Sequence, residues 1–326
     1  YTLHRFNPSL PMKTLKISFL QSTPDFGREG MLQLLKSRYH VVEDDSYFDY
    51  LVATPWFYVN REAFYHFLER APGHITVMYG CHEAIAPDFM LFDYYIGLDT
   101  VPGSDRTVKL PYLRHHLQEV HGGKEGLDAH ALLASKTAMF HKLSAFRFVN
   151  SLGPHLNNTP GDGHRAEDWY ASSIRMKKPY KFSIAFENAW YPGYTSEKIV
   201  TSMLAGTIPI YWGNPDISRE FNSASFIKCH DFPTLDDAAA YVQKVDEDDN
   251  LWCEIMSRPW KTPEQEARFL EETERETVKL YKIFDQSPEE ARRKGDGTWV
   301  SYYQRFLKRG HRMQLAWRRL KNRLRR

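Results

Sequence analysis

Long apolar runs are absent from this sequence of 326 residues. The longest stretch without a charged side chain, Ile199–Pro215, is interrupted by two glycines and a proline, so it is too short and too broken for a membrane-spanning helix. No basic-then-apolar block near the start predicts a secretory signal peptide, and Met12 could be a native start that makes Tyr1–Pro11 a leader. We therefore expect a protein that is soluble or attached to a membrane only at its surface.

Cysteine is also scarce. The three cysteines, Cys81, Cys229 and Cys253, have no metal-binding spacing, and any disulfide would leave one of them unpaired. This usage predicts buried thiols in a reducing compartment, the cytoplasm. A charged fraction of 26% together with 14% aromatic residues excludes an intrinsically disordered chain.

The net charge of +2 conceals an uneven distribution. Nine of the 43 basic residues lie in residues 308–326, which contain no acidic residue, so the rest of the chain carries 34 basic against 41 acidic side chains. Within this tail, Met313, Trp317, Leu320 and Leu324 recur at steps of four, three and four, as one stripe of a helix. A basic amphipathic helix with tryptophan predicts binding to an anionic membrane surface. The alternatives are a solubilising tail and nucleic-acid binding, and we expect no nucleic-acid partner.

Short apolar runs, expected to be strands, alternate along the chain with amphipathic segments, expected to be helices. This alternating rhythm is typical of parallel sheets with crossover helices. The glycine-rich stretch 99–130 breaks this rhythm, so we expect α/β domains over residues 1–130 and 131–300, with the basic tail at 301–326. Two such domains predict a ligand crevice between them, at the carboxyl ends of their strands. Strands are expected at 15–19, 50–53, 75–79, 94–98, 181–186, 207–212 and 225–229, and helices at 30–38, 61–70 after an Asn60 cap, 196–205, 235–245 and 263–284.

The densest cluster of polar and aromatic side chains lies in residues 186–199. A predicted strand ends there, a loop with proline and glycine follows, and a helix begins near Thr195 or Ser196. The free N–H groups and partial positive charge of such a helix N-terminus suit a phosphate. Lys198 adds a cation in the first turn, and Glu197 could accept hydrogen bonds from ribose hydroxyls. The cluster therefore predicts a nucleotide-phosphate site, although a capped helix with solvated Glu and Lys side chains would show the same pattern.

Seven segments between Gly153 and Phe232 match one enzyme family: Leu156–Asn158, Tyr180–Asn188, Gly193–Ile199, Gly206–Pro215, Phe221–Asn222, Ser225–Ile227 and His230–Phe232. They closely resemble the alpha-1,3-fucosyltransferases of glycosyltransferase family 10. The resemblance implies a GT-B fold, in which two Rossmann-like domains face each other across a crevice. It also implies that the C-terminal domain binds GDP-fucose, that the N-terminal domain binds the acceptor, and that the transfer inverts the anomeric configuration.

The resemblance also implies roles for individual side chains. Asn188, Tyr194, Glu197 and Lys198 fall on the family's donor-site positions and are expected to bind GDP-fucose. Lys198 and the helix N-terminus would stabilise the negative charge of the departing GDP, so we expect no metal or other cofactor to be required. The acidic triplet at 246–248 could hold a metal, but a solvated loop is the better interpretation.

An inverting transfer needs a base for the acceptor hydroxyl. Glu83 follows the predicted strand 75–79, and Phe89–Tyr94 resembles the family segment that follows the catalytic Glu, so we expect Glu83 to be this base. His82 is a rival base at neutral pH. A surface acid without a catalytic role is the simpler alternative for Glu83.

Two features depart from the family. The family has a strand ending in Ser-Asn and a phosphate-binding Arg ahead of the segment that resembles His141–Ser144, and this sequence lacks both. Lys136 or Arg147 could supply the missing cation. Residues Ala84–Pro87 are more apolar than the family norm, so acceptor contacts do not carry over from the family.

These inferences predict an inverting alpha-1,3-fucosyltransferase. It would transfer L-fucose from GDP-fucose to O3 of GlcNAc in N-acetyllactosamine-type glycans, which is Lewis x synthesis. We expect it to act in the cytoplasm, attached to the inner face of the membrane through its tail. The alternatives are another GT-B glycosyltransferase with a different sugar nucleotide, or an inactive glycan-binding relative.

Overall fold

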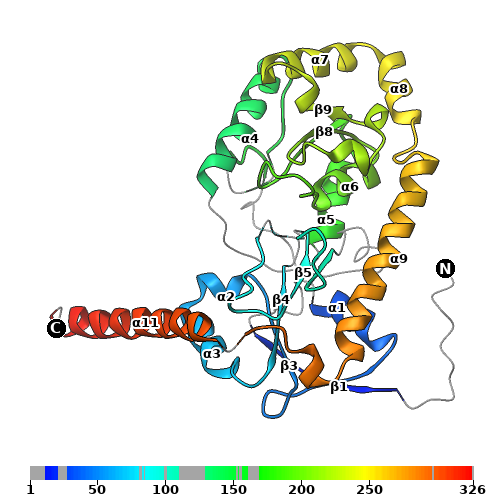
Figure 1. Ribbon diagram of the computed structural model, residues 1–326. Helices are drawn as coiled ribbons and strands as arrows, with labels where there is room; N and C mark the ends of the chain where they lie inside the picture. The colour runs from blue at the N-terminus through cyan, green and yellow to red at the C-terminus, as the bar shows by residue number, and fades with distance from the viewer. Residues whose placement is uncertain are drawn as a thin grey trace. The chain divides into compact units, whose positions relative to one another are not determined.

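A computed structural model describes residues 12–20, 28–80, 83, 85–98, 101–109, 129–151, 153, 156–160, 169–295 and 297–324 (Figure 1). The chain divides into two compact units: residues 1–110 with 275–326 form the first, and residues 111–274 form the second. Each unit contains a parallel β-sheet, which confirms the predicted α/β class. No helix in the part of the chain that the structure describes is long and apolar enough to cross a membrane.

The first unit is built on six parallel strands in the order β2-β1-β3-β4-β5-β6. Three of the four inner strands, β3, β4 and β5, are buried along their whole length, as expected for a parallel sheet with both faces covered. Helix α3 begins where the Asn60 side chain accepts hydrogen bonds from the backbone N–H groups of Glu62 and Ala63, each at 3.1 Å. The elements are β1 (Thr14–Leu20), α1 (Glu29–Lys36), β2 (His40–Glu43), β3 (Tyr50–Ala53), α2 (Trp56–Val59), α3 (Arg61–Arg70), β4 (Ile75–Tyr79), β5 (Tyr94–Gly97) and β6 (Thr107–Lys109).

The second unit contains a three-stranded parallel sheet in the order β7-β8-β9. One cluster of buried side chains joins this sheet to α7 through residues such as Ile208, Ile210 and Val242. A second cluster joins it to α6 through Ile199 and Met203. The elements are α4 (Ala129–Ser144), α5 (Trp169–Lys177), β7 (Phe182–Phe186), α6 (Glu197–Leu204), β8 (Ile208–Trp212), β9 (Ile227–Lys228), α7 (Leu235–Glu247) and α8 (Asp249–Ser257), with 3₁₀ turns at Ile217–Arg219, Ser223–Ser225 and Cys229–Asp231. Helix α9 (Pro263–Asp285) begins in this unit, and its residues from 275 onward belong to the first unit.

The two compact units divide the chain differently from the domains expected from the sequence. The division falls at 110/111, against an expected boundary at 130, and residues 275–300 group with the first unit, against an expected place in the C-terminal domain. The physical reason is burial: Leu280 and Phe284 of α9 lie in the same core cluster as strands of the first unit. Farther along, the buried Asp93 carboxylate accepts a hydrogen bond from the backbone N–H of Arg293 at 2.8 Å.

The C-terminal segment is helical, as predicted: α10 (Pro288–Ala291) is followed by α11 (Thr298–Leu324) (Figure 1). Tyr303 and Leu307 of α11 pack against the buried cluster around α3, and the Tyr303 hydroxyl donates to Asp88 Oδ2 at 3.2 Å. In the predicted apolar stripe, Met313 is 68% and Trp317 is 60% exposed. The side chains of Leu320 and Leu324 lie outside the described residues.

The cysteines differ in part from expectation. Cys229 is a buried free thiol, but the prediction of burial is wrong for Cys253, which is an exposed free thiol. Cys253 occupies an outward position of α8, since the neighbouring Ile255 takes the buried face of that helix. Cys81 lies outside the described residues.

Candidate functional site

A buried carboxylate follows strand β7. The Glu187 side chain is completely buried, and its backbone N–H donates to the carbonyl oxygen of Trp212 at 2.7 Å, which extends the pairing of β7 with β8. Glu187 Oε1 accepts a hydrogen bond from the backbone N–H of Ser196 at 2.8 Å, and Oε2 accepts one from the Ser196 hydroxyl. Glu187 therefore ties the first residues of α6 to the end of the sheet.

The N-terminus of α6 carries a fixed cation. Lys198 Nζ donates to Ser196 Oγ at 2.9 Å and to Glu187 Oε2 at 3.3 Å, and it lies 3.9 Å from Glu197 Oε1. Ser196 is the N-cap residue, but its side chain makes no capping hydrogen bond. The hydroxyl is directed to Glu187 instead, so the N-cap side chain does not occupy the first-turn N–H groups. A lysine ammonium and such N–H groups form the electropositive environment that suits an anion.

Asn214 ties the loop before α6 to the end of β8. Its side chain is completely buried; Oδ1 accepts from the backbone N–H of Gly193 at 2.8 Å, and Nδ2 donates to Thr195 Oγ1 at 3.0 Å. The backbone N–H of Asn214 donates to the Tyr211 hydroxyl at 3.1 Å. The protein's own contacts thus define the path of the loop between β7 and α6.

Gly213, between β8 and Asn214, is required by close packing. A Cβ atom at this position would overlap Cβ and Cγ of Glu187, and the backbone φ is +149°. The Gly213 N–H donates to Nε2 of His230 at 3.1 Å, which fixes that nitrogen as the acceptor. Only a glycine lets the backbone pass this close to the buried carboxylate.

We expect Gly213→Ala to lower the free energy of unfolding by about 3 kcal/mol, because the new methyl group must displace Glu187 from a packed interior. Urea denaturation of the full chain measures this change. Gly206→Ala is the matched control: Gly206 also has a positive φ, +74°, but no atom lies within 4 Å of the added Cβ. If both variants lost the same amount of unfolding free energy, backbone strain alone would explain the destabilisation at Gly213, and the overlap with Glu187 would not contribute.

The site lies within a segment that matches a known family. Residues 130–292 match the family described as glycosyltransferase family 10 (fucosyltransferase), C-terminal region. The chain belongs to this family. The matched range covers half of the chain and includes β7, α6, β8 and every side chain described above.

Two relatives show how the similarity is distributed. The alpha-(1,3)-fucosyltransferase FucT of Helicobacter pylori is 26% identical over 235 residues, which cover 57% of this chain and 48% of that protein. The human GDP-fucose protein O-fucosyltransferase 3 is 35% identical over 79 residues, which cover 24% of this chain and 16% of that protein. The chain therefore spans less than half the length of these curated relatives.

Solved structures share the fold. A crystal structure of an alpha1,3-fucosyltransferase aligns with a TM-score of 0.64 and 21% identity, over 83% of this chain and 90% of that one. A crystal structure of alpha1,3-fucosyltransferase with GDP-fucose aligns with a TM-score of 0.58 and 21% identity, over 79% of this chain and 85% of that one. These alignments confirm the predicted GT-B fold class.

The four donor-site positions predicted in this family 10 chain lie between the end of β7 and the first turn of α6. Glu197 and Lys198 are neighbours in that turn, with side chains 17% and 19% exposed. Tyr194 is only 2% exposed, and its backbone N–H donates to the carbonyl oxygen of Tyr191 at 3.1 Å. Asn188 follows the buried Glu187 directly and is partly buried.

The predicted base, Glu83, belongs to the first unit. It follows β4, is partly buried, and its backbone N–H donates to the carbonyl oxygen of Gly80 at 2.8 Å. This turn places Glu83 beyond the carboxyl end of a central strand, as the strand pattern predicts. The rival base, His82, lies outside the described residues.

Of the two candidate replacements for the family's phosphate-binding Arg, Arg147 and Lys136, the structure describes the side chain of Arg147 alone. Arg147 donates from Nη2 and Nε to Asp246 Oδ2, at 2.6 and 2.9 Å, so its guanidinium is engaged by the acidic triplet. Its side chain is nevertheless 67% exposed. The side chain of Lys136 lies outside the described residues.

The acidic triplet at 246–248 is not the solvated loop expected from the sequence. Asp246 lies in the last turn of α7, where it pairs with Arg147. Asp248 is the N-cap of α8 and accepts from the backbone N–H groups of Asn250 and Leu251 at 3.0 and 3.1 Å. The sequence pattern therefore comes from a helix-to-helix junction. Across the described ranges, no group of three or more His, Cys, Asp or Glu side chains has an arrangement that could hold a metal ion.

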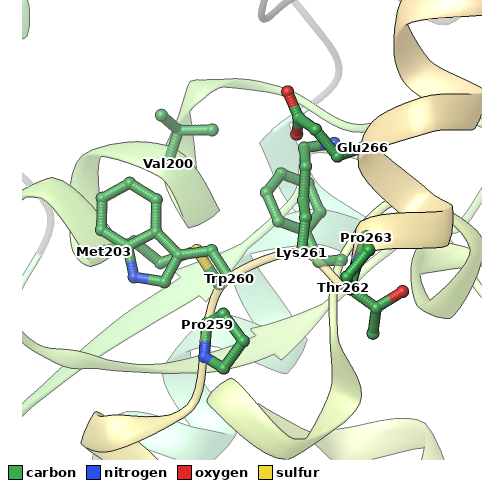
Figure 2. A pocket seen from close by; sticks show the side chains of 9 residues that line it. Val200, Met203, Pro259, Trp260, Lys261, Thr262, Pro263 and Glu266 are labelled. Atoms are coloured by element: carbon green, nitrogen blue, oxygen red, sulfur yellow. The ribbon is translucent and has the colours of Figure 1, made fainter.

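A separate pocket of about 540 Å³ lies beside the C-terminal half of α6 (Figure 2). Trp260 and Met203 lie on one side of it, and Lys261 and Glu266 lie on the other. None of the four predicted donor-site residues lines this pocket. Its lining residues are Val200, Met203, Phe221, Pro259, Trp260, Lys261, Thr262, Pro263 and Glu266.

Proposed function

We propose that this family 10 chain is an inverting alpha-1,3-fucosyltransferase that uses GDP-fucose as donor. The observation that carries the proposal is the Lys198 ammonium, held at the N-terminus of α6 by the buried Glu187. This cation lies within residues 130–292, the range that matches the fucosyltransferase family, and the names of two relatives of the chain include fucosyltransferase or GDP-fucose. A cation and N–H groups arranged in advance are what the departing diphosphate requires.

The proposed reaction assigns a role to each predicted residue. Glu83 accepts the proton of the acceptor hydroxyl while that oxygen attacks the anomeric carbon of fucose. The bond between this carbon and the phosphate oxygen breaks, and GDP leaves with the electron pair. Lys198 and the α6 N–H groups stabilise the charge on GDP. Asn188, Tyr194 and Glu197 bind the donor, and no metal is required.

We propose O3 of GlcNAc in N-acetyllactosamine-type glycans as the acceptor, because the bacterial relative is named an alpha-(1,3)-fucosyltransferase. A protein hydroxyl is the second candidate. It is favoured by the similarity to human GDP-fucose protein O-fucosyltransferase 3. Both acceptor classes are compatible with one donor site, because the acceptor hydroxyl changes while the diphosphate leaving group stays the same.

The deciding experiment measures GDP release from GDP-fucose in EDTA, with no acceptor, with N-acetyllactosamine, or with a peptide that offers Ser and Thr. Release that depends on lactosamine supports the proposal, and release that depends on the peptide supports the second candidate. Activity restored only by manganese would contradict the metal-free mechanism. Preference for another sugar nucleotide would identify a different GT-B transferase, and donor binding without turnover would identify an inactive glycan-binding relative.

We further propose that α11 attaches the enzyme to an anionic membrane surface, at the cytoplasmic face. Exposed apolar side chains recur along this helix at steps of three, four, seven and four, which places them on one face. Arg305, Arg309 and Arg312 are exposed on the same helix, which suits anionic headgroups. The stripe comprises Trp299, Tyr302, Phe306, Met313 and Trp317.

We expect the chain to sediment with phosphatidylserine vesicles at low salt, and to do so much less at high salt or with phosphatidylcholine alone. Replacing Met313 and Trp317 with Ser should reduce binding at least about tenfold, because two exposed apolar side chains no longer enter the interface. Truncation after Leu307 should abolish it. Trp260→Ser in the second unit removes another exposed tryptophan, 43% accessible, and serves as the control. Absence of sedimentation at low salt would contradict this part of the proposal.

A further inference from the structure

A second amine lies close to the N-terminus of α6. Lys177, the last residue of α5, donates from Nζ to Thr201 Oγ1 at 2.6 Å. Thr201 is 1% exposed, and its hydroxyl in turn donates to the backbone carbonyl oxygen of Lys198 at 3.2 Å. Lys177 is therefore connected through one buried hydroxyl to the backbone of the candidate phosphate-binding lysine. Its neighbour Lys178 is exposed.

Lys177 is electrostatically coupled to the same first turn. Burial lowers the pKa of its amine to about 8; of its charged neighbours, Glu197 raises this pKa and Lys198 lowers it. Burial and, after it, the charge of the same Glu197 carboxylate raise the pKa of Tyr170 in α5 to about 12. The charged groups that act on Lys177 are thus the two donor-site side chains of α6.

We propose that Lys177 is a positioning residue whose ammonium offsets the Glu197 carboxylate, so that diphosphate binding at the start of α6 depends on pH between about 7 and 9. The inference rests on the proposed GDP-fucose site and names the group that regulates it. Lys177 lies outside the motif at 186–199 and is not one of the four predicted donor-site residues. It precedes β7 in the sequence and approaches α6 only in the folded unit.

The charges of these groups determine the direction in which donor affinity changes with pH. Below pH 8 Lys177 is protonated, so Glu197 is offset and Lys198 with the α6 N–H groups can attract the diphosphate. Above pH 8 the amine is neutral, and the same turn carries one positive charge fewer. Since the anionic donor favours the protonated amine, binding must in turn raise the pKa of Lys177 and take up a proton. We expect the affinity for GDP-fucose to fall about fivefold from pH 7 to pH 9.

Calorimetric titration of the full chain with GDP-fucose tests this inference. At pH 8, titrations in two buffers of different ionisation enthalpy should reveal uptake of about 0.4 proton per donor bound in the wild-type chain. GDP-fucose suits this measurement because its diphosphate, esterified at both ends, has no group that titrates near pH 8.

Lys177→Met should bind about tenfold more weakly at pH 7, with affinity independent of pH and no proton uptake. Lys177→Arg should keep the pH 7 affinity, retain it at pH 9 and also take up no proton. Lys178→Met removes the adjacent exposed amine and should behave like the wild type.

The outcomes separate this inference from the function on which it rests. Wild-type binding with no proton uptake and no pH dependence would overturn the role of Lys177 and leave the donor site intact. If Lys177→Met still took up a proton on binding GDP-fucose and still showed pH-dependent affinity, the role of Lys177 would also be overturned. Failure of the wild-type chain to bind GDP-fucose at pH 7 would overturn the proposed function, and this inference with it. The wild-type proton uptake requires no substitution, so the inference stays testable even if Lys177→Met does not fold.

Discussion

Replacing Glu83 with Gln is expected to lower the rate of fucose transfer by about 100- to 10,000-fold, with the affinity for GDP-fucose within about twofold of the wild type. An amide has nearly the shape of the carboxylate, but it cannot accept the proton of the acceptor hydroxyl. Glu83 belongs to the first unit, whereas the proposed donor contacts belong to the second. The substitution should therefore affect turnover without altering donor binding.

Initial rates with lactosamine and calorimetric titration with GDP-fucose measure the two effects separately. Glu62→Gln is a matched control in the same unit, because the Glu62 side chain is 87% exposed at the start of α3. Unchanged turnover in Glu83→Gln would remove Glu83 as the base. A parallel loss of donor affinity would instead assign Glu83 a binding role.

Replacing Lys198 with Met is expected to lower kcat/KM by about 100- to 1,000-fold, because the leaving diphosphate loses a preorganised cation. The same change leaves the carboxylate of Glu187 buried without its ammonium partner, since this side chain is completely buried and lies 3.3 Å from Lys198 Nζ. An uncompensated buried charge should lower the free energy of unfolding by about 3–5 kcal/mol. Weaker donor binding and lower stability are thus expected together.

A double variant separates these two effects. Combining Lys198→Met with Glu187→Gln removes the buried charge as well as the cation, so stability should recover while donor affinity should not. Lys181→Met is a control in the same unit, since Lys181 pairs at 2.7 Å with Asp249, whose side chain is 86% exposed. Recovery of GDP-fucose affinity in the double variant would show that Lys198 acts only as the structural partner of Glu187. Urea denaturation and donor titration provide the two measurements.

Much of the secondary structure could be predicted from local patterns. The apolar run at 75–79 is β4, and the amphipathic repeat predicted at 263–284 is α9, Pro263–Asp285. Both patterns repeat with the period of their own element, so a short window is enough to identify them. The short strands β2 and β6 have no such signal. They contain four and three residues, and β6 falls inside the stretch 99–130 that the sequence predicted as a break.

The candidate site was predictable only in part. Glu197 and Lys198 stand out because a strand, a loop and a helix start follow one another within a few residues. Glu187 lies in the same motif, but its role depends on complete burial against Ser196 and Lys198, and burial is a property of the packed unit. An acid directly after an apolar strand is the one local signal that could have drawn attention to it.

The sequence by itself determined the family and the start of α6, because both depend on residues that are neighbours along the chain. Only the tertiary structure decided which sheet α9 packs against. An amphipathic pattern shows that one face of a helix is buried, but it does not show which sheet that face covers. The burial of Leu280 and Phe284 in the core of the first unit answers that question. The bonds of Glu187 to Lys198 and of Lys177 to Thr201 were likewise decided by packing. The energy of a buried charge depends on what surrounds it in space, and the order of residues alone does not specify those surroundings.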